Sequence, residues 1–280
     1  MNKNKLVKKS NSLVTARYEL PMVEQKLILT LIAGVEREDE DFKEYRFYIK
    51  DFFELIKYKE ENYTYVKNAF RSLMEKTLEM KTESGGWLLL HWLSSAKSEK
   101  GEGYVDVKFD PDLKPYLLKL KQCFTTYELK NILFLHSAYS LRIYEHLKQY
   151  EKTGVKNISI DELKDILQIK PHITTGDINQ RILKAAQKEL KKLTDISFTY
   201  NFTRRGNKYT DITFKIKRNS KMPKLLQKSQ IDAIDKVPSL QEVAESCYKK
   251  GKCRETPILM SYCKTCKNYD EKSIWLKENE

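Results

Sequence analysis

The sequence predicts an α+β protein of two tandem units, each made of helices followed by a β-hairpin, with a small cysteine-rich C-terminal tail. Two observations carry this prediction. Residues 177–218 combine an amphipathic helix with two alternating strands, and residues 45–109 show the same order of elements. A chain of 280 residues with 40% apolar residues is also long enough for two domain cores.

The predicted helix 177–193 has an apolar face and a cationic face. At about 100° per residue, its apolar positions fall on one side: Ile178, Ile182, Ala186, Leu190 and Leu193. The opposite side carries amide and cationic side chains: Gln180, Arg181, Lys184, Gln187, Lys188 and Lys191. Asp177 fits the N-cap position of this helix, with Gln180 three residues further on.

Two strands with alternating apolar residues follow the helix, over residues 196–202 and 212–216. The turn between them is basic and contains Arg204, Arg205 and Lys208. A cationic helix followed by a hairpin with a cationic tip is the layout of a winged helix-turn-helix domain. The helix of such a domain enters a DNA major groove, and its wing contacts the neighbouring backbone. We therefore expect residues 177–218 to be the main element that binds double-stranded DNA.

The distribution of charge supports this expectation. The chain has a net charge of +13, and residues 177–218 hold eleven Lys and Arg against four Asp and Glu. Residues 1–120 hold 21 against 20. A lysine-rich helix is often only a solvated surface, but a protein that neutralises DNA phosphates needs clustered positive charge. The excess on one helix and its hairpin therefore favours a DNA-binding surface.

The first unit follows a basic arm at residues 3–9 that we expect to be mobile. A helix should begin at Pro21 and end near Gly34, and the acidic run 36–41 reads as a solvated loop rather than a Mg²⁺ site. The remaining elements are expected in this order: a strand at 45–49, a helix at 51–58, a helix after the N-cap Asn62, a hairpin with its turn at 84–86, a strand at 105–109, and a short helix that begins at Asp110-Pro111.

The helix after Asn62 is the counterpart of helix 177–193. Its apolar face carries Tyr63, Val66, Phe70, Leu73 and Thr77. Its outward face is nearly neutral and carries Lys67, Asn68, Arg71, Ser72 and Glu75. Among these, Lys67, Asn68 and Arg71 are candidate DNA contacts. We expect the first domain to make the weaker contacts or to serve self-association.

The second unit is marked by two capping boxes. Thr125 with Glu128 predicts a helix over 126–135, and Ser159 with Glu162 predicts another helix after a long one at 137–150. Segments 45–56 and 157–167 resemble each other, and Ile49 corresponds to Ile160. The two units therefore read as an internal pseudo-repeat.

These elements predict four parts of the chain. They are an N-terminal winged-helix domain at 1–122, a C-terminal winged-helix domain at 123–220, a linker at 221–238 and a cysteine-rich tail at 239–280. No apolar run is long enough to span a bilayer, and the N-terminus lacks the apolar core of a signal peptide. We expect a cytoplasmic protein without a membrane partner.

Two stretches of the chain carry a family resemblance. They are KSNSLVTARYELPMVEQKLILTLI near the N-terminus and RILKAAQKELKKLTDISFTYNFTRRGNKYTDITFKIK, with its Glu-Leu, Thr-Asp and basic Gly-turn pattern. With them, roughly residues 8–218 resemble the initiator Rep proteins of iteron-bearing, theta-replicating plasmids. The tail beyond about residue 220 departs from this pattern.

The resemblance implies binding to repeated origin sequences, opening of an adjacent AT-rich segment, and recruitment of the host replication initiator and helicase. It also implies a monomer–dimer switch, in which monomers bind direct repeats and dimers repress the protein's own promoter. By matching position, it assigns the helix contacts to Arg181, Lys184 and Lys188, and the wing contacts to Arg204, Arg205 and Lys208. No cofactor is expected for DNA binding itself.

The tail contains four of the five cysteines: Cys247, Cys253, Cys263 and Cys266. In a reducing compartment, clustered cysteines favour a metal over disulfides. The C-x₂-C pair at 263–266 suits a structural Zn²⁺, whereas five residues between the first two cysteines is a looser spacing than usual. Inert or redox-sensitive thiols are the alternative.

Two other classes of protein compete with an initiator. A rolling-circle nickase needs a His-x-His metal pair and a nucleophilic Tyr, but the four histidines are scattered singly: His91, His136, His146 and His172. The sequence also lacks a phosphate-binding glycine loop followed by Lys-Ser/Thr. A protein that binds DNA without catalysis is therefore favoured. A winged-helix transcriptional repressor would share the same DNA-binding element, and its target, a lone inverted repeat, would distinguish it.

Overall fold

The computed structural model describes residues 5–36, 38–56, 63–82, 84–206 and 208–219. The predicted linker and cysteine-rich tail lie outside the described residues, as does the predicted N-cap Asn62. Within the described ranges, no helix combines the length and the apolar character needed to span a bilayer.

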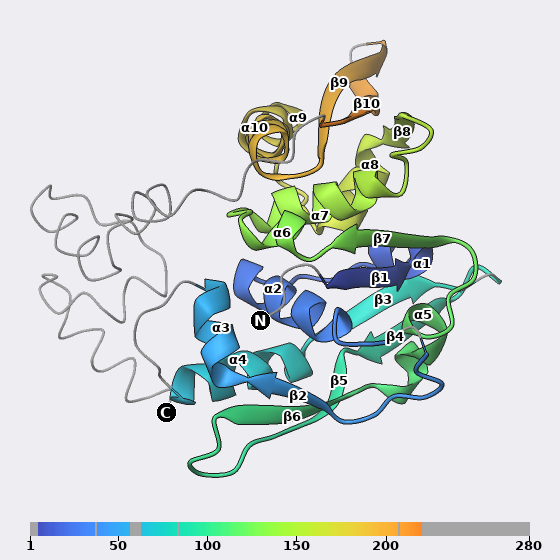
Figure 1. The fold of residues 1–280 in the computed structure, drawn as a ribbon. Helices are drawn as coiled ribbons and strands as arrows, with labels where there is room; N and C mark the ends of the chain where they lie inside the picture. Colours follow the sequence, from blue (N-terminus) through green and yellow to red (C-terminus); the bar gives the residue numbers. More distant parts are fainter. Residues whose placement is uncertain (1–4, 37, 57–62, 83, 207, 220–280) are drawn as a thin grey trace, which may run out of the picture. The chain divides into compact units, whose positions relative to one another are not determined.

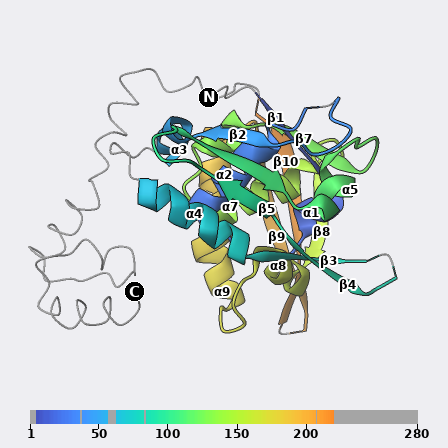
Figure 2. The ribbon, with the colours of Figure 1, turned by 90° about the horizontal axis from the view of Figure 1, so that it is seen from below.

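The first winged-helix unit, residues 22–109, packs helices against a three-stranded antiparallel sheet (Figure 1). Its elements are α2 (Met22–Ile32), β2 (Tyr45–Tyr48), α3 (Ile49–Ile56), α4 (Tyr63–Glu75), β5 (Leu93–Lys97) and β6 (Tyr104–Phe109), with the strands in the order β2-β6-β5. The apolar face of α4 is buried at Val66, Phe70 and Leu73 and lies against β5 (Figure 2). Two predicted members of that face are wrong, because Tyr63 is half exposed and α4 ends before Thr77.

The second winged-helix unit, residues 138–218, repeats this arrangement. Its elements are α7 (Ala138–Lys148), β8 (Val155–Ser159), α8 (Ile160–Leu167), α9 (Thr175–Asp177), a π-helical segment (Ile178–Leu183), α10 (Lys184–Leu193), β9 (Ile196–Arg205) and β10 (Lys208–Arg218). Its strands follow the order β8-β10-β9. Ser159 caps α8 as predicted, since its hydroxyl accepts the backbone N–H of Glu162 at 3.1 Å.

The internal pseudo-repeat is confirmed by this common topology. In both sheets, the first strand pairs with the last strand of the wing hairpin. Ile49 and Ile160 are the first residues of α3 and α8, and each follows its strand directly. The first unit carries an additional hairpin between α4 and β5, formed by β3 (Thr77–Lys81) and β4 (Trp87–His91). After β6, Asp110 caps a 3₁₀ turn (Pro111–Leu113) that leads into α5 (Lys114–Leu117).

Two predictions about segments outside the two winged-helix units are wrong. Residues 124–128 form strand β7 (Phe124–Glu128) instead of the start of a helix, and a short helix, α6 (Lys130–Leu133), begins only after it. The basic arm is not free either, because β1 (Leu6–Ser10) pairs antiparallel with β7 and leads into α1 (Asn11–Thr15). Thr125 and Tyr127 are buried, an alternation that fits a strand. The capping pattern is local, and pairing with a distant strand overrides it.

Charged side chains are buried where β1 meets α7. The Lys9 ammonium lies 2.5 Å from the carboxylate of Glu145, and neither side chain is exposed to solvent. The Tyr127 hydroxyl donates to the same carboxylate at 2.5 Å. Burial lowers the pKa of Lys9, and the neighbouring Glu145 carboxylate opposes this shift. Because a buried charge needs a partner, this pair holds β1 and α7 in one relative position.

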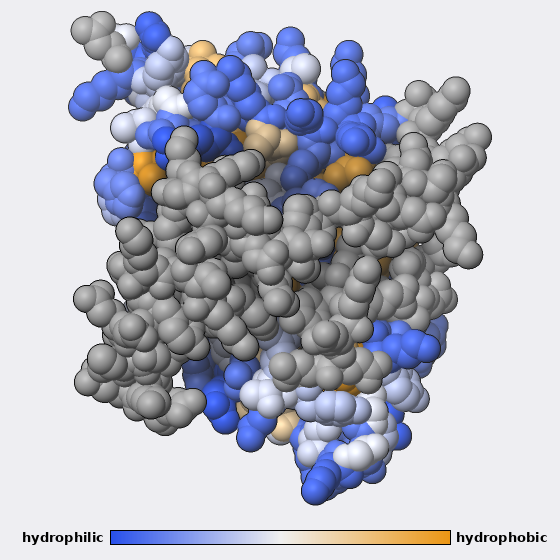
Figure 3. Space-filling view, turned by 90° about the vertical axis from the view of Figure 1, so that its left-hand side faces the viewer, coloured by the Kyte–Doolittle hydropathy of each residue, from blue (hydrophilic) through white to orange (hydrophobic). Residues whose placement is uncertain are grey.

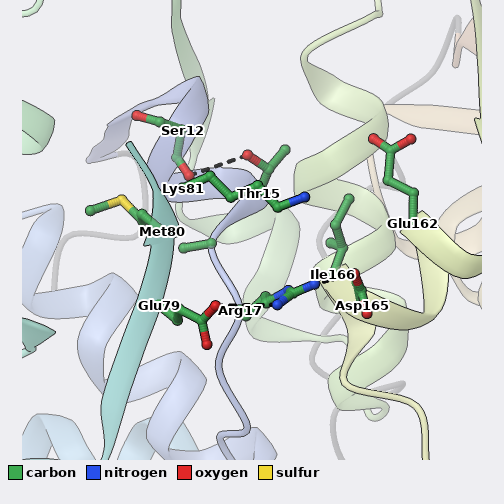
Figure 4. A pocket seen from close by; sticks show the side chains of 10 residues that line it. Ser12, Thr15, Arg17, Glu79, Met80, Lys81, Glu162, Asp165 and Ile166 are labelled. Carbon is green, nitrogen blue, oxygen red and sulfur yellow. Dashed lines mark hydrogen bonds and ion pairs between the residues drawn. The ribbon is translucent and has the colours of Figure 1, made fainter. Parts of the chain in front are cut away.

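Arg17 links β3 of the first unit to α8 of the second. Its guanidinium pairs with Glu79 at 3.2 Å and with Asp165, and its backbone forms a β-bridge with Glu79 (Figure 4). A cavity of about 180 Å³ lies beside this contact and is lined by residues of both units. The ion pairs are partly exposed, so they add specificity to the contact more than stability.

We predict that Lys9→Met destabilises the fold by about 3–5 kcal/mol, because it removes the cation 2.5 Å from the buried Glu145 carboxylate and leaves Arg142, 3.8 Å away, as its cationic neighbour. The double variant Lys9→Met/Glu145→Gln should recover most of this loss, since it removes both charges of the pair and keeps an acceptor for Tyr127. Urea unfolding measures both. Equal loss in the single and double variants would contradict the assignment of a buried ion pair.

A buried histidine predicts a pH-dependent stability. His146 on α7 is 2% exposed, and burial lowers its pKa to about 3. The unfolded chain binds this proton below about pH 6.5, whereas the folded chain does not until about pH 3. Stability should therefore fall as pH falls from 6.5, by up to about 1.4 kcal/mol per pH unit from this group. Between pH 7 and pH 5, the free energy of unfolding of His146→Phe should change less steeply with pH than that of the wild type. His172 is exposed, so His172→Gln should keep the pH dependence of the wild type.

Candidate nucleic-acid interface

The recognition helix is the continuous helix Thr175–Leu193, made of α9, the π-helical segment and α10. Its N-cap is Thr174, so the prediction of Asp177 is wrong by three residues. The Thr174 hydroxyl accepts the backbone N–H of Asp177 at 3.1 Å and donates to the Asp177 carboxylate at 2.7 Å. The hydroxyl of Thr174 lowers the pKa of this carboxyl, whose charge also suits a helix N-terminus. Thr and Asp both cap helices well, so the sequence did not decide between them.

The inner face of the recognition helix is the predicted one. Ile178, Ile182, Ala186 and Leu190 are buried, and Leu193 is half-buried against the core. The structure adds Leu183, which is fully buried next to Ile182. This burial fixes the direction of the opposite, polar face.

The outer face presents cations to solvent. The exposed residues are Gln180, Arg181, Lys184, Lys188 and Lys191. Among the described residues, no acidic side chain lies within ion-pair distance of Lys184, Lys188 or Lys191. Lys184 donates to the Gln180 side-chain oxygen at 2.8 Å, and Arg181 lies 3.4 Å from Asp177. Gln187 is half-buried and donates to the backbone carbonyl of Phe198 at 2.9 Å. Part of its hydrogen-bonding capacity is thus used inside the protein.

The wing is the hairpin of β9 and β10, which turns at Gly206. Adjacent strand residues point to opposite faces, so Arg204 lies on the face of Phe202 while Arg205 lies on the other. The Arg204 guanidinium stacks on the Tyr209 ring at 4.1 Å and donates to its hydroxyl. Arg205 and Lys208 are exposed and directly paired in register. The surface formed by α10 and the wing is mainly hydrophilic (Figure 3).

The stacking of Arg204 on Tyr209 was missed in the sequence. The signal that could have revealed it is the hairpin register, which places Tyr209 opposite Arg204. Ring contacts continue from Tyr209 through Phe202 and Tyr200 to Phe214 in the core. The wing therefore holds one of its arginines on a row of aromatic side chains rather than on a free loop.

In the first unit, α4 presents a smaller polar face. Lys67, Asn68 and Arg71 are exposed, as the sequence predicts. Ser72 is not available on that face, because it donates to the buried carboxylate of Glu24 on α2 at 2.7 Å. The outward face of α4 therefore carries Lys67 and Arg71 as its exposed cations, against Arg181, Lys184, Lys188 and Lys191 on the recognition helix.

The predicted metal ligands Cys247, Cys253, Cys263 and Cys266 lie outside the described residues. Within the described ranges, no three His, Cys, Asp or Glu side chains come together as a metal site. His146 lies inside α7, as expected for a packed residue.

Comparison with known proteins agrees with this architecture. A family model described as "Initiator Replication protein, WH1" matches residues 6–148, and one described as "Initiator Rep protein, WH2" matches residues 159–216. A replication initiation protein of Escherichia coli is 28% identical over 252 residues, which cover 84% of this chain and 77% of that protein. The structure of the Pi initiator protein in complex with iteron DNA superposes with a TM-score of 0.65 at 20% identity, covering 79% of this chain and 100% of that chain.

The last similarity shows a shared fold, and the family matches extend over more than half of the chain. The resemblance seen in the sequence is thereby confirmed. With its two winged-helix units and its cationic recognition helix, this protein belongs to the family of DNA-binding plasmid replication initiators.

Proposed function

We propose that this protein starts plasmid replication by binding direct repeats at the origin through the recognition helix and wing of its second unit. The observation that carries the proposal is the exposed cationic face of the recognition helix. The opposite face of this helix is buried in the core, so its cations point towards solvent. The related Pi initiator was crystallised on iteron DNA, which supports repeats as the target class.

The chemistry of the two surfaces suggests separate tasks. In the major groove, Arg and Lys bind guanine edges, and Gln pairs with adenine. Arg181, Lys184 and Gln180 have these side chains and are exposed. The wing carries Arg204, Arg205 and Lys208, which suit phosphates or the adjacent minor groove. The helix would select the sequence, while the wing would add affinity that depends on salt.

The first unit would contribute less to DNA binding. The exposed face of α4 carries Lys67, Asn68 and Arg71, which suit backbone contacts of modest strength. We further propose, from the family relationship, that binding leads to opening of an AT-rich segment and to recruitment of the host initiator and helicase. A dimeric form would repress the protein's own gene.

A transcriptional repressor without initiator activity is the second candidate, because a cationic recognition helix serves either role. A duplex containing tandem repeats from the DNA flanking the gene separates the two candidates. Preferential binding to direct repeats, and replication of a plasmid carrying them together with the gene, would support the initiator. Preference for a lone inverted repeat, without replication, would reject it.

We predict that Lys184→Ala or Arg181→Ala weakens binding to the specific repeat by roughly 1–3 kcal/mol if the side chain contacts a base edge. Binding to an unrelated duplex should change much less. Lys43→Ala removes the same charge from the acidic loop of the first unit and serves as control. Gel-shift titrations measure all three, and wild-type affinity in both helix variants would show that the helix is oriented differently on DNA.

A distinct result is predicted for the wing. Replacing Arg205 with Ala should weaken binding to every duplex alike and reduce the slope of log K against log salt by about 0.9 for one lost phosphate contact. Arg204→Ala should do the same, and Tyr209→Leu should reproduce part of the Arg204 effect because the stacking ring is lost. An unchanged salt slope in all three variants would exclude the wing from the interface.

We also propose that the cysteine-rich tail binds one structural Zn²⁺ through Cys247, Cys253, Cys263 and Cys266. Thiolates of a C-x₂-C pair suit zinc, and four protein ligands would leave no open position for catalysis. Metal analysis of the purified full-length protein should give roughly one equivalent of zinc. Chelation should make the tail more sensitive to protease. Absence of zinc together with unchanged protease resistance would reject the site.

A further inference from the structure

The recognition helix is irregular at the point where it would read DNA. Residues 178–183 follow a π-helical path, between α-helical residues on both sides. A π turn accommodates an additional residue, and such segments are frequent at functional sites. Because an α-helix has about 3.6 residues per turn, one additional residue rotates the preceding part of the helix by about 100° relative to the following part. The π segment thus decides which early side chains share the direction of Lys184 and Lys188.

Two hydrogen bonds attach the recognition helix to strand β9, one within the π segment and one in α10. The Tyr200 hydroxyl donates to the Asn179 side-chain oxygen at 2.7 Å. In α10, Gln187 donates to the carbonyl of Phe198 at 2.9 Å. The ring of Tyr200 is held between Phe202 and Phe214, with centroids 5.8 and 6.2 Å away. The hairpin therefore supplies a fixed point to which the π segment is attached.

The residues next to Asn179 are the first candidates for base contacts. Gln180 accepts a hydrogen bond from Lys184 and is thereby joined to α10. Arg181 pairs with Asp177 and is thereby directed towards the start of the helix. A regular α-helix would place Gln180 and Arg181 at another angle to Lys184. The rotation set by the π segment consequently defines the pattern of donors and acceptors offered to a groove.

We propose that Asn179 and Tyr200 are positioning residues that set this rotation and thereby determine which base pairs the protein prefers. The inference rests on the proposed function, because it concerns the same interface. Base edges are read by paired hydrogen bonds of restricted geometry, so a rotated Gln180 or Arg181 loses its base. Phosphate contacts by flexible lysines tolerate such a rotation, so overall affinity for DNA is largely kept.

The test is a selection of binding sequences from a randomised duplex library by the full-length protein. Tyr200→Phe removes only the hydroxyl and keeps the ring in place, and Asn179→Ala removes the acceptor. Both variants should lose preference at the same few adjacent base pairs, by about tenfold where one good base contact is lost. Their salt dependence on a duplex of unrelated sequence should equal that of the wild type.

Two further variants separate positioning from general stability. Asn179→Asp keeps an oxygen acceptor for Tyr200 and should retain the wild-type base preference, even though its charge lowers affinity for every duplex. Tyr139→Phe makes the same chemical change on α7, at a ring that is 37% exposed, and should leave the preference unchanged. Thermal unfolding of each variant is recorded alongside.

The outcomes are distinct. Wild-type preference in both Tyr200→Phe and Asn179→Ala would overturn this inference and leave the proposed function in place. A uniform loss of affinity with an unchanged preference, or a lower melting temperature alone, would also overturn it, because that result describes a purely structural role. A wild-type protein that enriches no motif would overturn the proposed function itself, and this inference with it.

Discussion

The position of the N-terminal segment against α7 and α8 depends on the buried guanidinium of Arg142. This guanidinium is buried on α7 and donates to the backbone carbonyls of Val14 at 3.0 Å, Ala16 at 2.6 Å and Ile166 at 3.0 Å. It also lies over the ring of Tyr18, 3.9 Å from the ring centroid. Arginine stays charged in proteins, so its burial requires acceptors on several sides. Carbonyls from the N-terminal segment and from α8 meet this requirement together.

This constraint connects the N-terminal segment to the DNA-binding surface. Helix α7 contacts both α8 and α10, so the recognition helix packs against it. The next residue after Ala16, Arg17, contacts the β3–β4 hairpin through a β-bridge and an ion pair with Glu79. Packed side chains and charged hydrogen bonds therefore connect the two units through this segment.

The sequence predicted those features that depend on local patterns. The inner face of the recognition helix, the cap at Ser159 and the position of the wing follow from periodicity and from short-range polar contacts. The pseudo-repeat was also visible, because a strand followed directly by a helix has the same pattern at Ile49 and at Ile160. These signals lie in residues that are close in the sequence, so they can be recognised before the fold is known.

The features that were missed depend on distant partners. Strands β1 and β7 pair where the sequence predicted a mobile arm and the start of a helix. The local sequence contains no signal for this pairing. The π segment has no local sequence signal either, and its contacts are with distant residues: Ile182 and Leu183 are buried in the core, and the Tyr200 hydroxyl donates to Asn179. The candidate DNA contacts follow from charge and from helical position, and the structure adds that Lys184, Gln187 and Arg204 already contact neighbouring residues.

The pairing of β1 with β7 also has a consequence for synthesis of the protein. The first strand leaves the ribosome early, but its partner at 124–128 is translated much later. Until then the Lys9 side chain remains hydrated, and its burial against Glu145 must wait for α7 to emerge. The β1–β7 pair and the buried Lys9–Glu145 pair can therefore be complete only after α7 has been synthesised, more than 120 residues after β1.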